Sequence, residues 1–252
     1  EKHGELRRIS AEVDWREEIG AVARINLSLD GPGLLFENIR DHKHTRCTKF
    51  LTGTLGNRRQ VCLLLGLPTG TPDKAIIQHL RACYRRGIPP VEVATGPVKT
   101  HKLAGADLDL GEFPVPHWHH LDGGRFIDTF CGVVTRNPKN GQMNVGIYRG
   151  QVIAPDKIGK LLIPTQHWGS HFAEHRETSS PMPVAVVHGW HDVLPFCAGS
   201  PFPKGICEYD MMGAILGRPV ELVRCETSAL LIPASAEIVI EGEIDVSETV
   251  EE

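Results

Sequence analysis

The chain has 252 residues, a length that buries a sizeable core and suits two ordinary domains. Hydrophobic residues make up 41% and charged residues 23%, as in ordinary globular proteins, and no apolar run reaches the roughly 18 residues of a membrane helix. The formal net charge is -4 and the basic pairs are dispersed, which leaves no electrostatic footprint for nucleic acid. These properties exclude a membrane span and a nucleic-acid-binding protein, and favour a small-molecule ligand.

Seven cysteines are scattered along the chain, and none of them is spaced as CxxC. That pattern favours reduced thiols over a disulfide framework or a zinc ribbon. The first residues, EKHGELRRIS, lack the apolar stretch and the small-residue cleavage site of a secretory signal. We therefore expect a cytoplasmic protein.

The first hundred residues predict alternating helices and strands. Residues 5–23 favour helical segments, whereas the runs 33–39 and 61–67 are apolar and typical of strands. A further helix is predicted to begin at Pro72, the first helical position, and to end before Gly87. This alternation predicts an N-terminal α/β domain.

A stretch rich in turn-forming residues places a domain boundary near residue 105, so the predicted domains are 1–105 and 106–252. The second domain has the pattern of an antiparallel barrel or sandwich with a few helices. Asn140-Gly141 predicts a hairpin turn within 137–141, because both residues tolerate positive φ. The further elements expected are strands at 126–135, 143–153, 183–187, 219–225 and 236–241 and a helix at 209–216.

A histidine cluster in the segment 117–125 is the first candidate for chemistry. Neighbouring residues of an extended chain point to opposite faces, so only His117 and His119 are placed to share a metal, and His120 is not. One hypothesis is a metal-hydrolase site. The favoured alternative is that these side chains pack a loop against the sheet.

Three hard donors from separate segments, Asn144, His167 and Glu208, are the second candidate. Each alone has an ordinary explanation, as a residue of a hairpin, a turn or a helix start. Together they would suit Mn²⁺ or Mg²⁺ holding a phosphate. The segment 199–205 would then offer backbone N–H groups to the same phosphate, although a simple turn explains it equally well.

Arg149 is the third candidate, since a guanidinium clamps a carboxylate through two parallel hydrogen bonds. It lies five residues after Asn144, an odd separation that sends two side chains of a straight strand to opposite faces. A shared site would therefore need a bulge, which Gly146 permits. A surface arginine is the alternative.

Several long motifs resemble the UbiD family of reversible decarboxylases over nearly the whole chain. They are PGLLFENI at 32–39, LGEFPVPHWHHLDGGRFI at 110–127, NVGIYR at 144–149, Gln166-His167, GAILGRPVELVRCET at 213–227 and IPASAEIVIEG at 232–242. The resemblance implies that the second domain is a split β-barrel like those of flavin reductases. It also implies that the family's C-terminal α/β domain is absent from these 252 residues and that the full-length form is a homo-oligomer.

The resemblance further implies a prenylated FMN cofactor, held through Mn²⁺ with K⁺ nearby and supplied by a UbiX-type flavin prenyltransferase. The metal ligands would be Asn144, His167 and Glu208. The residues expected to contact the cofactor are Asn144, Val145, Gly146, Ile147, Arg149, Gln166, His167, Ala198, Gly199, Ser200, Pro201 and Glu208.

The implied reaction is decarboxylation of an aromatic, heteroaromatic or α,β-unsaturated carboxylic acid. Arg149 would orient the carboxylate, and Glu252 falls where the family has the first of two acids, while the second acid has no counterpart here. The sequence is therefore expected to be a truncated portion of the enzyme, with turnover at least about a hundredfold below a full-length version. The alternative is a module that binds cofactor and metal without turnover on its own.

Overall fold

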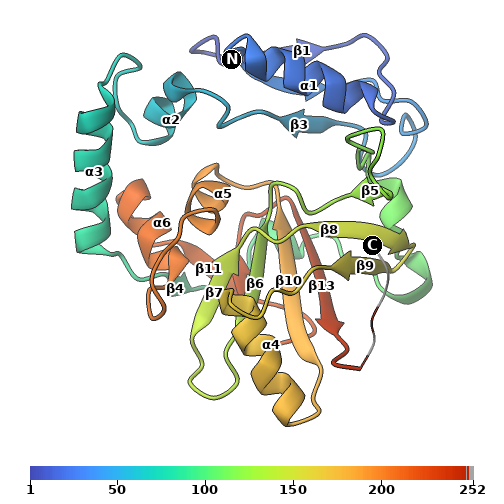
Figure 1. Cartoon of the computed structure of the whole chain (residues 1–252), viewed down its shortest axis with the longest axis vertical. Helices are drawn as coiled ribbons and strands as arrows, with labels where there is room; N and C mark the ends of the chain where they lie inside the picture. Colours follow the sequence, from blue (N-terminus) through green and yellow to red (C-terminus); the bar gives the residue numbers. More distant parts are fainter. Residues whose placement is uncertain (248, 250–252) are drawn as a thin grey trace.

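A computed structural model describes residues 1–247 and 249 of the chain. Figure 1 shows an N-terminal part in blue and teal beside a larger part that runs from green to red. The N-terminal part contains β1 (Leu6–Ile9), α1 (Glu18–Ser28), β2 (Gly33–Phe36), β3 (Phe50–Thr52), α2 (Arg58–Leu64) and α3 (Asp73–Arg86). The rest contains β4 (Val91–Glu92), three 3-10 turns (Pro97–Lys99, Gly105–Asp107, Leu110–Glu112), β5 (Arg125–Phe126), β6 (Gly132–Arg136), β7 (Met143–Gly146), β8 (Gly150–Ala154), β9 (Lys157–Lys160), α4 (His167–Glu177), β10 (Met182–His188), α5 (Val193–Ala198), α6 (Glu208–Leu216), β11 (Glu221–Arg224), β12 (Leu231–Pro233) and β13 (Ile238–Ile244).

Two N-terminal expectations are wrong. The segment 61–67 is not a strand, because α2 runs through it. A capping box starts this helix: the Gln60 N–H donates to the Asn57 side chain at 3.0 Å, and the Asn57 N–H donates to the Gln60 side chain at 3.1 Å. The segment 5–23 begins with a strand, and its helix starts only at Glu18. A short apolar run does not by itself distinguish a strand from a helix, so the local hydrogen bonds decide.

The N-terminal part is nevertheless an α/β unit, as predicted. Strand β2 pairs in parallel with β1 and antiparallel with β3. Buried side chains of α1 and β2, among them Ile19 and Phe36, form one small core. The predicted helix at 72 is α3, although Pro72 precedes its first residue and does not occupy it.

The sheet that organises the second part has the strand order β13-β10-β6-β7 and is antiparallel throughout. Successive side chains of β6 point to opposite faces, so Val133 packs with Trp168 of α4 whereas Val134 packs with the residues of α5 and α6. Figure 1 shows α4 on one side of this sheet and α5 and α6 on the other. Among the described strands, β7 ends the order, so no strand pairs with its outer edge.

The predicted hairpin joins β6 to β7. Its turn is held by the Asn137 side chain, which accepts the N–H groups of Lys139 at 2.9 Å and Asn140 at 3.0 Å. Gly141 alone of the pair has a positive φ, 74°. The predicted strands at 183–187, 219–225 and 236–241 are present as β10, β11 and β13, and the predicted helix at 209–216 is present as α6.

The strands of the second part do not form a closed barrel among the residues described. Two smaller sheets accompany the central one, β5-β8-β9 and β12-β11-β4, and only the β11–β4 pair is parallel. The fold is therefore mixed α/β with an antiparallel second part, and the split-barrel description stays a prediction. The boundary at residue 105 also stays a prediction, although β4 already belongs to a sheet with β11.

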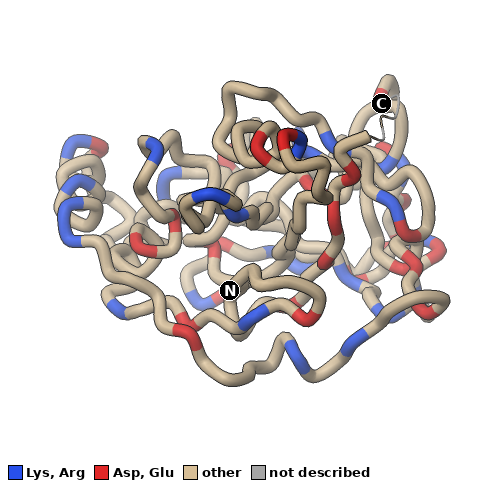
Figure 2. Tube along the Cα trace, turned by 90° about the horizontal axis from the view of Figure 1, so that it is seen from below, with Lys and Arg blue, Asp and Glu red and all other residues tan. Residues whose placement is uncertain are grey.

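Charges of both signs are distributed along the whole trace (Figure 2), as the near-neutral composition implies. Within the described residues, no helix has the length and apolar character that a membrane crossing requires.

Arg125 ties the two parts together. Its guanidinium donates to the carbonyls of Phe113 at 2.7 Å and Val115 at 3.0 Å, and it lies 4.4 Å from the ring centre of Trp15. Burial lowers the pKa of Arg125, since the charged form loses water. A planar group with several fixed donors is needed to satisfy two carbonyls and an aromatic face at once.

We predict that Arg125→Lys lowers the free energy of unfolding by about 2–3 kcal/mol, because one ammonium does not replace both hydrogen bonds and the stacking. The matched control is Arg224→Lys, which alters an exposed ion pair with Glu92 and should cost no more than about 1 kcal/mol. Denaturant unfolding measures both. Equal losses would show that Arg125 is not a structural link.

Candidate functional site

The proposed metal ligand Asn144 is placed by the register of the β6–β7 hairpin. Its partner across the ladder is Thr135, and directly opposed residues of an antiparallel pair share one face of the sheet. Thr135 faces α4, since its hydroxyl lies 3.0 Å from Nδ1 of His171 in that helix. Asn144 is therefore a buried side chain on the α4 face, next to the edge of the sheet.

His167 is the first residue of α4 and lies one helical turn before His171, on the same side of the helix. Burial lowers the pKa of His171 to about 4 against the opposing charge of Glu174, and the nearby His167 contributes in the same direction as burial. The neutral ring of His171 thus bonds Thr135, and the N-terminus of α4 carries His167 toward the same face as Asn144.

Glu208 reaches the edge of β7 from the other side of the sheet. It is the first residue of α6, and its Oε2 accepts the Val145 N–H at 2.9 Å. Burial raises the pKa of this carboxyl, and the Val145 N–H opposes the shift. A buried carboxylate with one backbone donor retains lone pairs for a cation.

Tyr148 contacts one of these proposed ligands, Asn144, and nothing in the sequence singled it out apart from its place inside NVGIYR. Its hydroxyl accepts from Nδ2 of Asn144 at 3.2 Å, and its ring stacks on Trp168 with the ring centres 4.1 Å apart. Gly146 makes this possible, because a Cβ there would lie 2.5 Å from the Tyr148 ring. The absence of a side chain at Gly146 lets the Tyr148 ring approach the backbone of β7. Strand β7 ends at Gly146 without the bulge that the sequence suggested.

The other expected cofactor contacts lie around the same edge. Gln166 precedes α4, and its Oε1 accepts the indole N–H of Trp168 at 3.1 Å. Gly199 follows α5, and a Cβ there would lie 3.5 Å from Cδ1 of Ile147. The structure thus gathers β7, the N-termini of α4 and α6 and the end of α5, where two helix N-termini favour an anion. The cofactor and metal roles assigned to all these residues, including Ala198, Ser200 and Pro201, stay predictions, as does the separation of the three metal donors.

Arg149 projects from the segment between β7 and β8 into a cleft of about 660 Å³. The cleft lies between α1 and the loop after β3 on one side and the 118–130 segment on the other, with Phe126 and Phe130 in its wall. The Arg149 guanidinium is 6.0 Å from the ring centre of Phe126. A cation beside aromatic rings suits a planar carboxylic acid. Glu252 lies outside the described residues.

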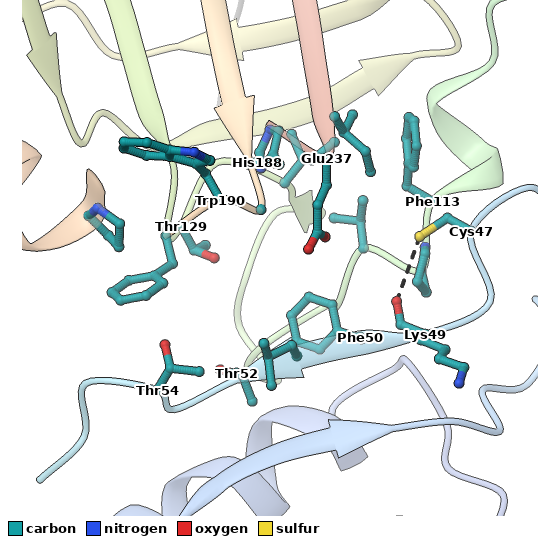
Figure 3. A pocket seen from close by; sticks show the side chains of 18 of the residues that line it. Cys47, Lys49, Phe50, Thr52, Thr54, Phe113, Thr129, His188, Trp190 and Glu237 are labelled. Carbon is teal, nitrogen blue, oxygen red and sulfur yellow. Dashed lines mark hydrogen bonds between the residues drawn. The ribbon is translucent and has the colours of Figure 1, made fainter. Parts of the chain in front are cut away.

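A second cavity, of about 240 Å³, lies between β3 and the ends of β10 and β13. Figure 3 shows His188 and Glu237 on one side of it and Phe50 and Thr52 on the other. Aromatic rings and charged side chains of both signs line this cavity. His188 lies at its inner wall, beside the buried Asp128.

The histidine cluster at 117–125 holds a loop together. The His117 ring lies 2.9 Å from the carbonyl of Asp122, whose carboxylate accepts the His119 N–H at 2.9 Å. The side chain of His120 is 82% exposed. Among the described residues, no three His, Cys, Asp or Glu side chains form a metal-binding group. The structure therefore supports the packing interpretation and gives no support to a hydrolase site here.

A buried ionic cluster was not expected from the sequence. The carboxylate of Asp128 is fully buried, pairs with Lys160, and lies 3.0 Å from Nε2 of His188, which is not aligned for a regular hydrogen bond. Burial alone would raise the pKa of Asp128, but His188 and Lys160 hold it below its usual range. The three residues are far apart in sequence, so no spacing reveals them.

Comparison with known proteins identifies the family. The model of the 3-octaprenyl-4-hydroxybenzoate carboxy-lyase Rift-related domain matches residues 90–252, and that of the corresponding N-terminal domain matches residues 1–80. The chain belongs to the UbiD family. Pyrrole-2-carboxylic acid decarboxylase of Pseudomonas aeruginosa is 35% identical over 254 residues, which cover 98% of this chain and 51% of that protein. Phenolic acid decarboxylase of Bacillus subtilis is 33% identical, with 97% and 52% covered.

Solved UbiD-class structures share the fold. Vanillic acid decarboxylase of Sedimentibacter hydroxybenzoicus in its closed form has a TM-score of 0.90 and 28% identity, covering 97% of this chain and 52% of that one. An evolved dimeric form of a UbiD-class enzyme of Pelotomaculum thermopropionicum, in complex with prFMN, has a TM-score of 0.86 and 31% identity, with 96% and 54% covered. The chain thus spans about half the length of these UbiD relatives.

We predict that Glu208→Gln raises the stability of the metal-free protein at pH 7 and abolishes the pH dependence that this carboxyl causes. Because its folded pKa is raised, the cost of burying the charge is absent below the unfolded pKa and fully present above the folded one. The amide still accepts the Val145 N–H. Mn²⁺ affinity should fall at least about tenfold, and in the native protein it should weaken as the pH falls.

Asp210→Asn is the matched control, since it removes another acid from the first turn of α6. Calorimetric Mn²⁺ titration and unfolding at pH 5 and pH 7 measure both variants. Unchanged Mn²⁺ affinity in Glu208→Gln would remove Glu208 from the site.

Proposed function

We propose that this chain binds prenylated FMN through a divalent metal at the edge of β7 and forms the cofactor-binding part of a UbiD-type decarboxylase of aromatic, heteroaromatic or α,β-unsaturated acids. The observation that supports this best is the meeting of Asn144 and Glu208 at one strand edge, beside the N-terminus of α4 that carries His167. The relatives named as decarboxylases act on acids of this kind.

The donors suit Mn²⁺. Nδ2 of Asn144 is engaged with Tyr148, so Oδ1 is the atom available to a metal, and Oε2 of Glu208 is engaged with Val145, so Oε1 is available. With one imidazole from His167 this is a mixed oxygen and nitrogen set, which favours Mn²⁺ over structural zinc. We also propose that K⁺ binds near this Mn²⁺ site.

The phosphate of the cofactor would lie where the N-termini of α4 and α6 approach the strand. Lys204, in the loop before α6, adds a positive charge near His171. Residues 144–147, Gln166 and the 198–201 loop would contact the rest of the cofactor. When bound, prenylated FMN would supply the electron sink for loss of CO₂.

The residues of the chain would position the substrate and exclude water. Arg149 would hold the substrate carboxylate, with Phe126 and Phe130 beside the planar part of the acid. A carboxyl group would return the proton to the product, and Glu252 is our candidate by its place in the sequence. The cofactor would come from a UbiX-type flavin prenyltransferase, and the full-length form would be a homo-oligomer.

The alternative is a module that binds cofactor and metal without turnover. Reconstitution with prenylated FMN and Mn²⁺, followed by measurement of CO₂ release from a panel of unsaturated acids, separates the two. Release of CO₂ supports the enzyme, and bound cofactor without release supports the module.

We predict that co-expression with a flavin prenyltransferase yields purified protein with a flavin spectrum and the mass of prenylated FMN. Asn144→Ala should lower the amount of bound cofactor at least about tenfold, because it removes one metal ligand and the partner of Tyr148. Asn140→Ala, in the same hairpin, is the control and should retain the cofactor. Native protein free of flavin, or equal retention by the two variants, would refute the proposal.

A further inference from the structure

The buried pair Asp128–Lys160 lies directly against the segment that carries Arg149. Lys160 is the ladder partner of Gly150, and Ile127 and Asp128 both donate their N–H groups to the Gly150 carbonyl, at 3.0 Å and 3.3 Å. A Cβ on Gly150 would lie 2.2 Å from the Asp128 carboxylate. The space over this glycine is therefore filled by the Asp128 carboxylate and the Ile158 side chain.

Lys160 also binds the residue before Arg149. Its ammonium donates to the backbone carbonyl of Tyr148 at 3.2 Å and lies 6.0 Å from the ring centre of Trp168, on which the Tyr148 ring stacks. The side chain of Lys160 is only 7% exposed, so the carbonyl and the carboxylate replace the water that the ammonium has lost. The Lys160 ammonium thus binds the backbone before Arg149, while the backbone pairing of Lys160 with Gly150 and the N–H group of Asp128 hold the backbone after it.

The same contacts extend to the metal site. The Tyr148 hydroxyl accepts from Asn144, so the position of the Tyr148 backbone governs how this hydroxyl meets the asparagine. On the far side, His188 connects Asp128 to the cavity of Figure 3. The ion pair therefore lies between that cavity and Tyr148, whose side chain contacts Asn144 and whose backbone precedes Arg149.

We propose that Lys160, paired with Asp128, is a positioning residue: it fixes the 147–150 segment, sets Tyr148 against Asn144 and directs Arg149 into the cleft. The consequence for cofactor and substrate rests on the proposed function, whereas the fixing of the segment does not. A lysine that served only to neutralise Asp128 would be replaceable once the aspartate is neutral. A positioning lysine would not.

The test compares Lys160→Met with the charge-balanced variant Asp128→Asn/Lys160→Met. The single variant leaves a buried carboxylate without its main cation, so its denaturation midpoint should fall, and the double variant should regain most of it. In both variants the Tyr148 carbonyl loses its donor. Hydrogen exchange across 146–152 should therefore be faster by at least about tenfold in both, and affinity for Mn²⁺ with FMN should fall about tenfold or more.

Lys99→Met is the matched control. Lys99 is 17% exposed, pairs with Glu226 at 2.6 Å and donates to the Arg224 carbonyl, so it makes the same kinds of contact away from the site. The Lys99→Met variant should leave hydrogen exchange across 146–152 and the affinity for FMN unchanged. Full recovery of protection in the double variant, or exchange in Lys160→Met equal to that in Lys99→Met, would overturn the inference. If the native protein binds neither Mn²⁺ nor FMN, the proposed function fails, and the exchange comparison still decides the role of Lys160.

Discussion

The pairing register of β6 with β7 is the constraint on which the rest of the candidate site depends. Opposition of Thr135 and Asn144 puts the asparagine on the α4 face, while opposition of Val134 and Val145 puts the valine in the core beneath α5 and α6. A slip of one residue would exchange the two faces. Because β7 is the last strand of its sheet, the Val145 N–H remains available to Glu208. Register and edge position together place Asn144 on the α4 face and leave the neighbouring N–H group to the first residue of α6.

Two buried carboxylates, Asp128 and Glu208, have pKa shifts of opposite direction. Asp128 pairs with Lys160 and lies beside His188, and its pKa is lowered despite burial. Glu208 receives a backbone N–H, and burial raises its pKa. The charge of Asp128 is already neutralised by Lys160. The charge of Glu208 has no such partner among the described residues, so a bound cation would stabilise it further. This contrast favours the proposed role of Glu208 as a metal ligand and is consistent with a structural role for Asp128.

Ambiguous short apolar runs and contacts between residues far apart in the chain limited what could be predicted from the sequence. The α/β start, the hairpin, α6 and the antiparallel second part follow from local pattern, and the long motifs identified the family. The sequence did not predict α2, because its short apolar run fits a strand as well as a helix. It did not predict the cluster of Asp128, Lys160 and His188 either, since these residues meet only in the fold. Gly146 was expected to permit a bulge, yet it makes room for the Tyr148 ring.

The most direct test of the central claim is anomalous diffraction at the manganese edge from crystals of the protein grown with Mn²⁺ and FMN. The account predicts one strong peak at the edge of β7, bonded to Asn144 Oδ1, a ring nitrogen of His167 and a carboxylate oxygen of Glu208 at about 2.0–2.6 Å. A peak bonded to other residues, or none when FMN is present in the crystal, would contradict it.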